Sequence, residues 1–450
     1  MQSHTKPFEL RKRIHGKRCF IHGITFCFFI LFISQTFQVA KMIPKRQTIY
    51  FDEIQQPQLS FSPILWTRQQ SALPVHQLFH PHNKSFAVQV PPEVEFLEEY
   101  MIWHDEMRSK FPDSDLLTNP NAPDVSIYYN CGIGGAHDRF FSIDAALYHS
   151  FVHKKILLVY WYGTEKLDQF VVPNMINWTV PTHFHNLTFS RDTPCRDYDK
   201  KTYKRAPGIV SDDGKVVLRT PFNYANFGYT NDTLSYAWYA LFRPSHLLQA
   251  ELNDLTRQLG LIPARYHVAH CRIRHPAHLG YAFARNPEDH DGANYTGEQR
   301  SLGIATAIRA IQCADRISHD DSNNDLPIYF YSDADQLVDS VIRRSTPLDA
   351  LEAELHNVSL ASRVVARTNT IPIAHIGDMK HGPIESYMAT FVDLYIAASS
   401  RCLAMGVGNF AYLSARISRT ACVARHADLP QSTQMKWGMK KFANMKSCSI

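Results

Sequence analysis

Beyond residue 95, short apolar runs alternate with stretches of helical periodicity, a pattern typical of α/β proteins. Residues 125–130 (VSIYYN) and 156–161 (ILLVYW) predict two buried strands, joined by a helical pattern over residues 140–153. A second block begins near residue 262, with predicted strands at 266–271, 327–332, 364–367, 371–376 and 402–405 and predicted helices at 297–319, 337–344, 384–399 and 409–417. We therefore expect an α/β fold with two Rossmann-like domains built on parallel sheets.

Two segments are less regular. Residues 95–103 space apolar side chains at helical intervals between glutamates, which predicts a short amphipathic helix or, alternatively, a continuation of an irregular stem. Residues 163–235 are rich in proline and aromatic residues without sustained periodicity. We expect this segment to be an irregular insertion or a set of loops that face a substrate.

The longest uncharged apolar stretch is residues 19–40, which contain no acidic or basic residue apart from His22. About 20 apolar residues suffice to cross a bilayer as a helix, so this stretch predicts a signal anchor. Six Lys or Arg residues precede it and three follow closely, which predicts a cytosolic N-terminus and a luminal body. A cleaved signal peptide and an organelle transit peptide are the alternatives.

The boundaries that we expect follow from these changes in pattern. Residues 41–90, rich in proline and glutamine, predict a stem between anchor and body. The expected organisation is a cytosolic tail (1–18), the anchor (19–40), the stem (41–90), an N-terminal domain (91–255), a C-terminal domain (256–425) and a C-terminal tail (426–450).

Charge and modification signals fit this topology. The net charge of +5 is small for 450 residues and much of it flanks the anchor, which argues against nucleic acid as a partner. Six Asn-x-Ser/Thr sequons follow the anchor and fit a luminal body, at Asn83, Asn177, Asn186, Asn231, Asn294 and Asn357.

Seven of the nine cysteines lie beyond the anchor, without the spacing of a zinc site. In an oxidising lumen we expect some of them to pair. Cys131, Cys271 and Cys402 lie in or beside predicted strands, where the simplest expectation is a buried apolar role.

A glycine-rich turn follows the first predicted strand. It contains Gly132, Gly134 and Gly135, followed by Asp138 and Arg139. Glycines let backbone amides approach a ligand where a strand meets a helix. The spacing matches neither the dinucleotide-binding fingerprint nor a Walker motif, so a tight turn that simply needs small residues is equally open.

The strand at 266–271 ends in a basic segment with His270, Arg272 and Arg274. Ligands of α/β proteins bind at the carboxyl ends of parallel strands, and guanidinium groups there suit a diphosphate. The alternative is a solvated strand end with surface arginines.

The strand at 327–332 ends in Ser332 and Asp333, the start of an Asp-x-Asp sequence that reaches Asp335. Such a pair can hold a divalent metal on a sugar donor. The strand before it and the helix after it favour capping of that helix by Ser332 and Asp333, with or without nucleotide contact. We therefore expect no metal site.

The segment 390–413 contains two further candidates. Asp393 lies in an otherwise apolar helical stretch, and Gly406, Gly408 and Asn409 form a turn between a strand and the next helix. The amides at that helix start could bind a phosphate. Ordinary α/β packing with glycine in a tight corner is the alternative.

Taken in this order, these blocks resemble the fucosyltransferase superfamily, which uses GDP-fucose on a GT-B-like fold. The resemblance is carried by two strand ends, one helix with its turn, and the glycine-rich turn, namely His270, Arg272, Ser332, Asp333, the segment from Asp393 to Phe410, and the segment from Gly132 to Arg139. Residues 273–276 (IRHP) and 406–409 (GVGN) depart from sequences common in that family.

The resemblance implies an inverting transfer of fucose from GDP-fucose with no essential metal cofactor. It implies that Arg272 neutralises the charge of the leaving diphosphate. It also implies an acidic residue as the base that activates the acceptor hydroxyl, with Asp138 as the first candidate and Glu385 as the second. The other residues that it implies for donor binding or support are His270, Arg274, Ser332, Asp333, Asp393, Gly406, Gly408, Asn409, Gly132, Gly134, Gly135 and Arg139.

We thus expect a single-pass type II membrane protein of the Golgi or endoplasmic reticulum. Its luminal N-terminal domain would face a glycan or glycoprotein acceptor, and its C-terminal domain would bind the nucleotide sugar. One alternative is a glycosyltransferase for another nucleotide sugar, with a metal at Asp333 and Asp335. The other is a non-catalytic luminal relative that keeps the fold.

Overall fold

The computed structural model of the protein describes residues 95–130, 135–161, 167–186, 209–211, 213–219, 221, 233–272, 297–317, 325–342, 358–368, 384–406, 408–418, 420, 422–426 and 446–448. All of them belong to one compact unit, Ser60–Ile450. The predicted tail, anchor and stem (residues 1–90) lie outside the described residues. Among the helices of the described part, none has the length and apolar character needed to span a membrane.

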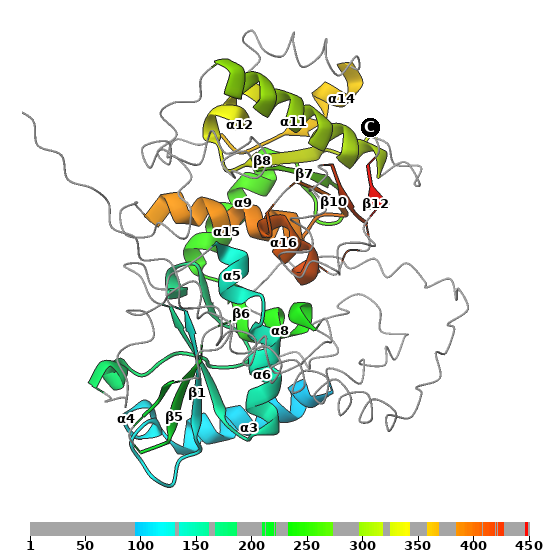
Figure 1. The fold of residues 1–450 in the computed structure, drawn as a ribbon. Coiled ribbons are helices and arrows are strands. Elements are labelled where there is room, and N and C mark those ends of the chain that lie inside the picture. Colours follow the sequence, from blue (N-terminus) through cyan, green and yellow to red (C-terminus); the bar gives the residue numbers. More distant parts are fainter. Residues whose placement is uncertain are drawn as a thin grey trace, which may run out of the picture. The chain divides into compact units, whose positions relative to one another are not determined.

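Within the described residues, the first sheet has four strands in the order β2-β1-β5-β4 (Figure 1). The central strand β1 (Val125–Asn130) pairs in parallel with β2 (Ile156–Trp161) and with β5 (Val216–Arg219). The edge strand β4 (Ile209–Val210) runs antiparallel to β5. All six residues of β1 are buried, so the strand is covered on both faces and shows no polar alternation.

The helices around this sheet are α3 (Phe96–Lys110), α4 (Asp113–Leu116), α5 (Ala136–Phe140), α6 (Ile143–Val152) and α8 (Leu234–Leu241). Helix α6 packs against β1 and β2, and α3 packs on α6. The hydroxyl of Tyr100 on α3 donates to the carbonyl of Lys155 and accepts from the N–H of Leu157, both at 2.9 Å. The predicted amphipathic helix is confirmed as α3, which is longer than its pattern indicated.

Shorter elements complete this half of the chain. They are the 3-10 turns η3 (Leu167–Gln169) and η4 (Thr182–Asn186), the antiparallel pair β3 (Val171–Pro173) and β6 (Phe242–Pro244), and α9 (His246–Gln258), which leads to the second sheet. Ser245 caps α9, because its hydroxyl accepts from the N–H of Leu248 at 3.2 Å.

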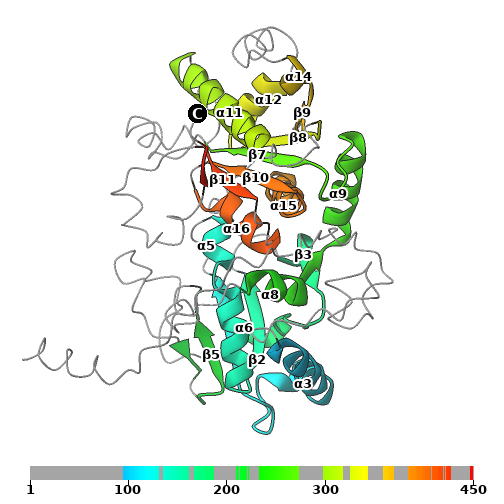
Figure 2. The same ribbon diagram turned by 90° about the vertical axis from the view of Figure 1, so that its right-hand side faces the viewer.

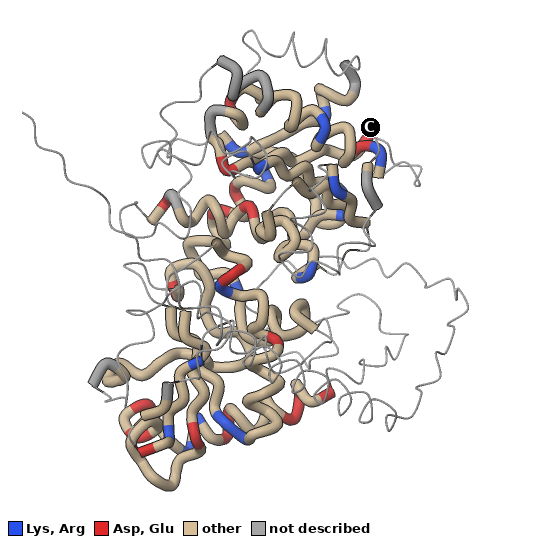
Figure 3. The backbone as a smooth tube through the Cα atoms, in the orientation of Figure 1, with Lys and Arg blue, Asp and Glu red and all other residues tan. Residues whose placement is uncertain are grey.

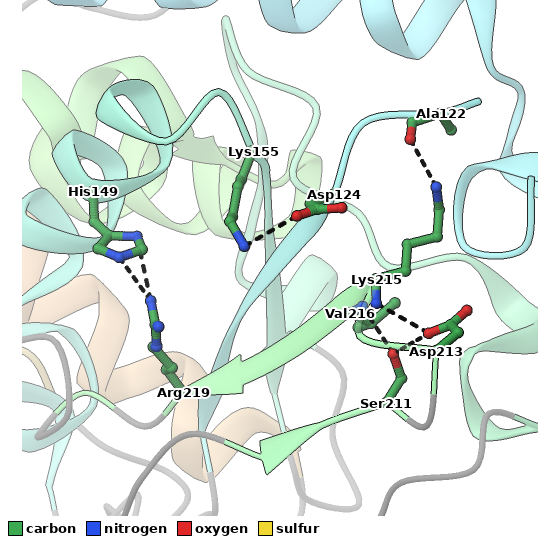
Figure 4. Close-up of polar contacts among 9 residues, drawn as sticks. All are labelled: Ala122, Asp124, His149, Lys155, Ser211, Asp213, Lys215, Val216 and Arg219. Carbon is green, nitrogen blue, oxygen red and sulfur yellow. Dashed lines mark hydrogen bonds and ion pairs between the residues drawn. The ribbon is translucent and has the colours of Figure 1, made fainter. Parts of the chain in front are cut away.

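The expectation of irregular structure across residues 163–235 was wrong for β5, which has only four residues and therefore too few to show periodicity. Polar contacts hold this strand in place (Figure 4). Lys215 is buried, and its Nζ donates to the carbonyl of Ala122 at 2.7 Å. At the other end of β5, Nη1 of Arg219 lies 2.7 Å from Nε2 of His149 on α6.

The part of the chain that the structure describes forms a second sheet of six parallel strands in the order β9-β8-β7-β10-β11-β12. They are β7 (His267–Cys271), β8 (Ile328–Ser332), β9 (Val364–Val365), β10 (Cys402–Met405), β11 (Val423–Arg425) and β12 (Lys446–Ser447). In chain order this is 3-2-1-4-5-6, the doubly wound arrangement of Rossmann-type sheets. The α/β fold class is confirmed, and β11 and β12 extend the sheet beyond the strands that the sequence predicted.

Helices cover both faces of this sheet (Figures 1 and 2), namely α11 (Gly297–Arg316), α12 (Asp335–Ile342), α14 (Val358–Ser362), α15 (Ile384–Ala398) and α16 (Phe410–Ser418). Ala269 and Cys271 belong to an apolar cluster with residues of α11, α12 and α14. Val268 and Leu403 belong to another cluster with residues of α15 and α16. Successive residues of a strand thus serve opposite faces.

The second apolar cluster also joins the two halves of the compact unit. The first half contains the first sheet and the elements from α3 to α9, and the second half contains the second sheet and its helices. It contains residues of α3, α6 and α8 together with Val268 and Leu403. Across this boundary Phe170 stacks on Phe391, with ring centroids 4.5 Å apart. The two sheets therefore share part of one hydrophobic core.

Two disulfides lie in the second half, Cys313–Cys448 and Cys402–Cys422. The expectation of an unpaired apolar role was therefore wrong for Cys402. It is confirmed for Cys271, which is buried and free. Cys131 lies outside the described residues.

Candidate functional site

The chain order of the second sheet places a switch point between β7 and β10. From β7 the chain proceeds to β8 on one side, and from β10 it proceeds to β11 on the other. In doubly wound sheets, ligands bind outside the carboxyl ends of the strands at such a point. The residues found there are the end of β7, from His270 to Arg272, and the turn that starts at Gly406.

Arg272 places a cation at this edge, directly after β7. Its Nε lies 3.5 Å from Oδ2 of Asp333, and both side chains are 24 % exposed. Asp333 follows β8, which pairs with β7, so the two strand ends singled out in the sequence meet in one ion pair. Acidic and basic residues are interspersed over the described backbone (Figure 3), so this charge is local and not part of an extended basic stripe.

The glycine turn after β10 lies against Arg272. Gly408 has a φ of +91°, and a Cβ atom at this position would stand 2.6 Å from Nη1 of Arg272. Gly406 donates its N–H to the carbonyl of His270 at 3.1 Å, and a Cβ there would stand 3.0 Å from the same oxygen. Contacts at this edge, and not only the tightness of a corner, therefore favour glycine at both positions.

Helix α16 begins directly after this turn. The carbonyl of Asn409 accepts the N–H of Leu413 at 3.0 Å, so Asn409 stands at the helix start. The first amides of a helix lack intrahelical acceptors and carry the positive end of its dipole. A nine-residue helix that starts beside an arginine is well suited to phosphate groups.

His270 is buried, and its ring centroid lies 4.8 Å from that of Tyr331 and 6.3 Å from that of Phe410. Its carbonyl accepts a second hydrogen bond, from Nε2 of His426 at 2.8 Å. Burial lowers the pKa of His426 to about 4, so the ring is neutral at physiological pH and Nε2 carries the donated proton. The sequence did not single out His426, because it follows a three-residue strand and no motif surrounds it.

Asp138 lies on α5, just after the glycine-rich turn. Its Oδ2 accepts the N–H of Gly135 at 3.3 Å, as a capping carboxylate does, and its Oδ1 lies 3.5 Å from Nδ1 of His137. Burial alone would raise the pKa of Asp138, but the bonds from His137 and Gly135 and the charges of His137 and Arg272 lower it below its ordinary value. Asp138 is therefore ionised at neutral pH and interacts electrostatically with Arg272.

Arg139, the neighbour of Asp138, lies in different surroundings. It is only 1 % exposed, and its guanidinium lies over the ring of Trp161, 4.5 Å from the centroid. The structure thus places this arginine in the core of the first half, as part of a cation–π contact.

Asp393 is buried and accepts the hydroxyl of Tyr329 at 2.6 Å, with Nη2 of Arg367 3.9 Å away. Tyr329 is the second residue of β8, so this contact lies toward the amino end of the strand and supports the sheet. Ser332, at the carboxyl end, accepts the N–H of Ala334 at 3.3 Å, immediately before α12 starts at Asp335. This turn fits the capping hypothesis.

The remaining candidates are less informative. Gly132, Gly134, Arg274 and the side chain of Asp335 lie outside the described residues. Glu385 is exposed on the first turn of α15. Within the described part of the chain, no group of three or more His, Cys, Asp or Glu residues could hold a metal ion.

No protein-family model and no curated protein sequence matches the chain. The chain is similar to solved structures of fucosyltransferases. NodZ α-1,6-fucosyltransferase soaked with GDP-fucose is 9 % identical, with 66 % of this chain and 92 % of that chain covered and a TM-score of 0.40. A mutant of Arabidopsis thaliana FUT1 in complex with GDP is 12 % identical, with 74 % and 78 % covered and a TM-score of 0.43.

Fucosyltransferase NodZ from Bradyrhizobium is 11 % identical, with 65 % of this chain and 92 % of that chain covered and a TM-score of 0.40. The described structure therefore resembles these fucosyltransferases. At such TM-scores and identities the resemblance assigns no role to any residue of this chain.

Proposed function

We propose that this protein is a glycosyltransferase that moves fucose from GDP-fucose to a hydroxyl group of a glycan or glycoprotein. The observation that carries the proposal is Arg272 at the switch point of a doubly wound sheet, in contact with Asp333 and with the glycine turn of β10. A guanidinium beside a helix start suits the diphosphate of a nucleoside diphosphate.

In the proposed donor complex, the terminal nitrogens of Arg272 bind the diphosphate while its Nε stays with Asp333. Nη1 faces Gly408, so a phosphate that reaches it also approaches the turn and the first amides of α16. The buried ring of His270 and the bond from His426 support the strand end from behind. Preorganised donors of this kind stabilise charge that develops on a leaving group.

The chemistry is a displacement at C1 of fucose. The acceptor oxygen forms the new bond to C1, the bond between C1 and the β-phosphate oxygen breaks, and its electron pair leaves with GDP. The diphosphate gains charge as this happens, which Arg272 offsets. The proton of the acceptor hydroxyl passes to a base, for which we propose Asp138, because this carboxylate is ionised and interacts with the charge of Arg272.

The proposed location is the lumen of the Golgi or endoplasmic reticulum, with residues 19–40 as a type II anchor. Two observations in the described residues support it. The disulfides Cys313–Cys448 and Cys402–Cys422 are typical of oxidising compartments. The sequon residue Asn177 is exposed, and its Oδ1 accepts the hydroxyl of Thr179 at 2.6 Å.

A ligand-dependent thermal shift tests the function. The full chain in detergent is titrated with GDP, GDP-fucose, GDP-mannose and UDP-sugars, with and without chelator, beside Arg272→Ala. Arg257→Ala is the control, because that arginine lies on α9 and is 75 % exposed. We expect GDP and GDP-fucose to stabilise the wild type and the control, with chelator present, but not Arg272→Ala.

Other outcomes separate the alternatives. Chelator-sensitive stabilisation by a UDP-sugar would favour a metal-dependent transferase for another donor. No stabilisation by any nucleotide would favour a non-catalytic protein that keeps the fold.

A further inference from the structure

Arg416 joins α16, the helix that starts after the glycine turn of β10, to the segment that carries Asp138, the proposed base. It lies in the last turn of α16, and its side chain is 13 % exposed. Its Nη1 donates to the carbonyl of Phe141 at 2.8 Å, and its Nη2 lies 3.3 Å from Oδ2 of Asp144. Phe141 is the C-cap residue of α5, and Asp144 lies in the first turn of α6.

The two partners of Arg416 come from the other half of the compact unit. A guanidinium has its donors in one plane, so bonds to two groups on adjacent helices fix both the distance and the orientation of α16. A second contact acts alongside, because the ring of His137 on α5 lies 5.9 Å from that of Tyr412 on α16. The corner between α5 and α6 is therefore held against the side of α16.

Among the elements that Arg416 joins, α16 starts at the turn beside Arg272 and α5 carries the proposed base. Helix α16 begins after Gly408, which touches Arg272, and α5 carries Asp138 two residues before its C-terminal end. From Phe410 to Arg416 the helix rises by about 9 Å, so Arg416 lies well away from the diphosphate. It is not placed to touch the donor.

We propose that Arg416 is a positioning residue that sets the distance between Asp138 and the sugar carbon bound at Arg272. The inference rests on the proposed function. Proton removal and bond formation require the base, the acceptor oxygen and C1 in one geometry, and a displacement of about 1 Å can cost roughly 100-fold in rate. Because Arg416 lies at the far end of α16, its loss changes this geometry and leaves the diphosphate contacts in place.

The chain offers a matched control. Arg363 is also 13 % exposed, and it also binds one backbone carbonyl and one carboxylate. Its Nε donates to Leu326 at 3.0 Å, and its Nη1 donates to Asp315 at 2.9 Å. This second arginine joins elements of the second half alone. A lysine at either position keeps the charge but cannot bind both partners in the same plane.

The test compares Arg416→Lys, Asp144→Asn and Arg363→Lys with the wild-type full chain. GDP binding is measured by calorimetry, GDP release from GDP-fucose is measured with water as the acceptor, and Tm is recorded for each variant. We expect Arg416→Lys and Asp144→Asn to lower kcat at least 10-fold, with KM for GDP-fucose and Kd for GDP within about twofold of wild type. We expect Arg363→Lys to lower Tm by about as much as Arg416→Lys does, and to keep the kcat of the wild type.

Loss of rate in proportion to loss of Tm in all three variants would overturn the inference, because Arg416 would then act only on stability. An equal rise in KM and in Kd for GDP in Arg416→Lys would overturn it as well, because the residue would then belong to donor binding. If the wild-type chain does not bind GDP, the proposed function fails and this inference fails with it. GDP binding with an unchanged kcat in Arg416→Lys refutes the inference alone.

Discussion

Gly408 lies so close to Arg272 that a side chain at position 408 would overlap with the arginine side chain. A methyl group on Gly408 would stand 2.6 Å from Nη1 and 2.9 Å from Cδ of Arg272. The strand end after β7 and the turn after β10 are therefore in direct contact, although the sequence separates them by more than a hundred residues. The glycine gives the arginine its position at the switch point.

Gly408→Ala is expected to weaken GDP binding at least 10-fold, because the new methyl group displaces Arg272. It also places alanine at a φ of +91°, which costs roughly 1–2 kcal/mol of stability. Gly260→Ala separates the two effects, since Gly260 has a φ of +63° and nothing within 4 Å of the added atom. Calorimetry with GDP and urea unfolding should show a similar stability loss in both variants and weaker binding only in Gly408→Ala.

Asp138→Asn is expected to lower kcat by roughly 10²–10⁴-fold and to leave GDP binding nearly unchanged, because the amide cannot accept the acceptor proton. Initial rates of GDP release at saturating GDP-fucose measure the effect. Glu385→Gln is the companion variant, since Glu385 is the second acidic candidate and is exposed on α15. A full rate in Asp138→Asn together with a large loss in Glu385→Gln would reverse the assignment.

The pH profile gives a second test of Asp138. The pKa of its carboxyl lies below the ordinary 3.8, so the base stays ionised as the pH falls to that value and the acid limb of kcat/KM lies lower still. His137→Phe removes a hydrogen bond and a charge that hold the pKa down, so the acid limb should move to higher pH. An acid limb that does not move in this variant would mean that another group sets it.

Stability should fall as the pH decreases from about 6.5 to about 4, because burial chiefly lowers the pKa of both His104 and His426 from 6.5 to about 4. Above pH 6.5 both rings are neutral in the folded and in the unfolded chain, so their burial carries no cost of removing a proton. In this interval the unfolded chain binds more protons, so each histidine can remove up to about 3 kcal/mol. Urea unfolding at several pH values measures the slope. His426→Gln should reduce it, and the exposed His246→Gln should not.

Asn177 tests the luminal location independently of activity. The side chain is exposed, while Trp178 beside it is buried and donates its Nε1–H to the carbonyl of Leu241 at 2.7 Å. In a luminal protein we expect a glycan on Asn177, seen as a loss of apparent mass in Asn177→Gln relative to wild type. Thr179→Ser keeps the sequon and should keep the glycan. The result that would argue against a luminal body is that all three proteins have the same mobility and that glycosidase changes the mobility of none of them.

Long apolar strands and periodic helices could be predicted from the sequence. The bounds of β1, β2 and β10 agree with their apolar runs, because strands buried on both faces leave an uninterrupted signal. Strand β5 could not be found this way, because it has four residues and lies between irregular segments. Strands β11 and β12 are shorter still and owe their place to pairing with β10 and with each other.

The candidate site could be predicted only as far as it lies at strand ends. Arg272 and Asp333 follow β7 and β8, so sequence position and sheet topology together imply that they meet. Arg416 and His426 act through groups that are distant in the chain, and neither lies in a motif. Arg139 shows the converse, because its place beside the glycine turn predicted a ligand contact while its side chain packs on Trp161.

The disulfide Cys402–Cys422 joins two cysteines 20 residues apart, at the start of β10 and just before β11. Between them lie Gly406, Gly408, Asn409 and Arg416, so the glycine turn and the whole of α16 lie within one covalent ring. Closing a ring of this size restricts the unfolded chain by about 3 kcal/mol in the chain-entropy description. A protease cut inside the ring would leave the two ends attached. Formation of this disulfide therefore fixes the size of the loop from which the proposed phosphate-binding turn folds.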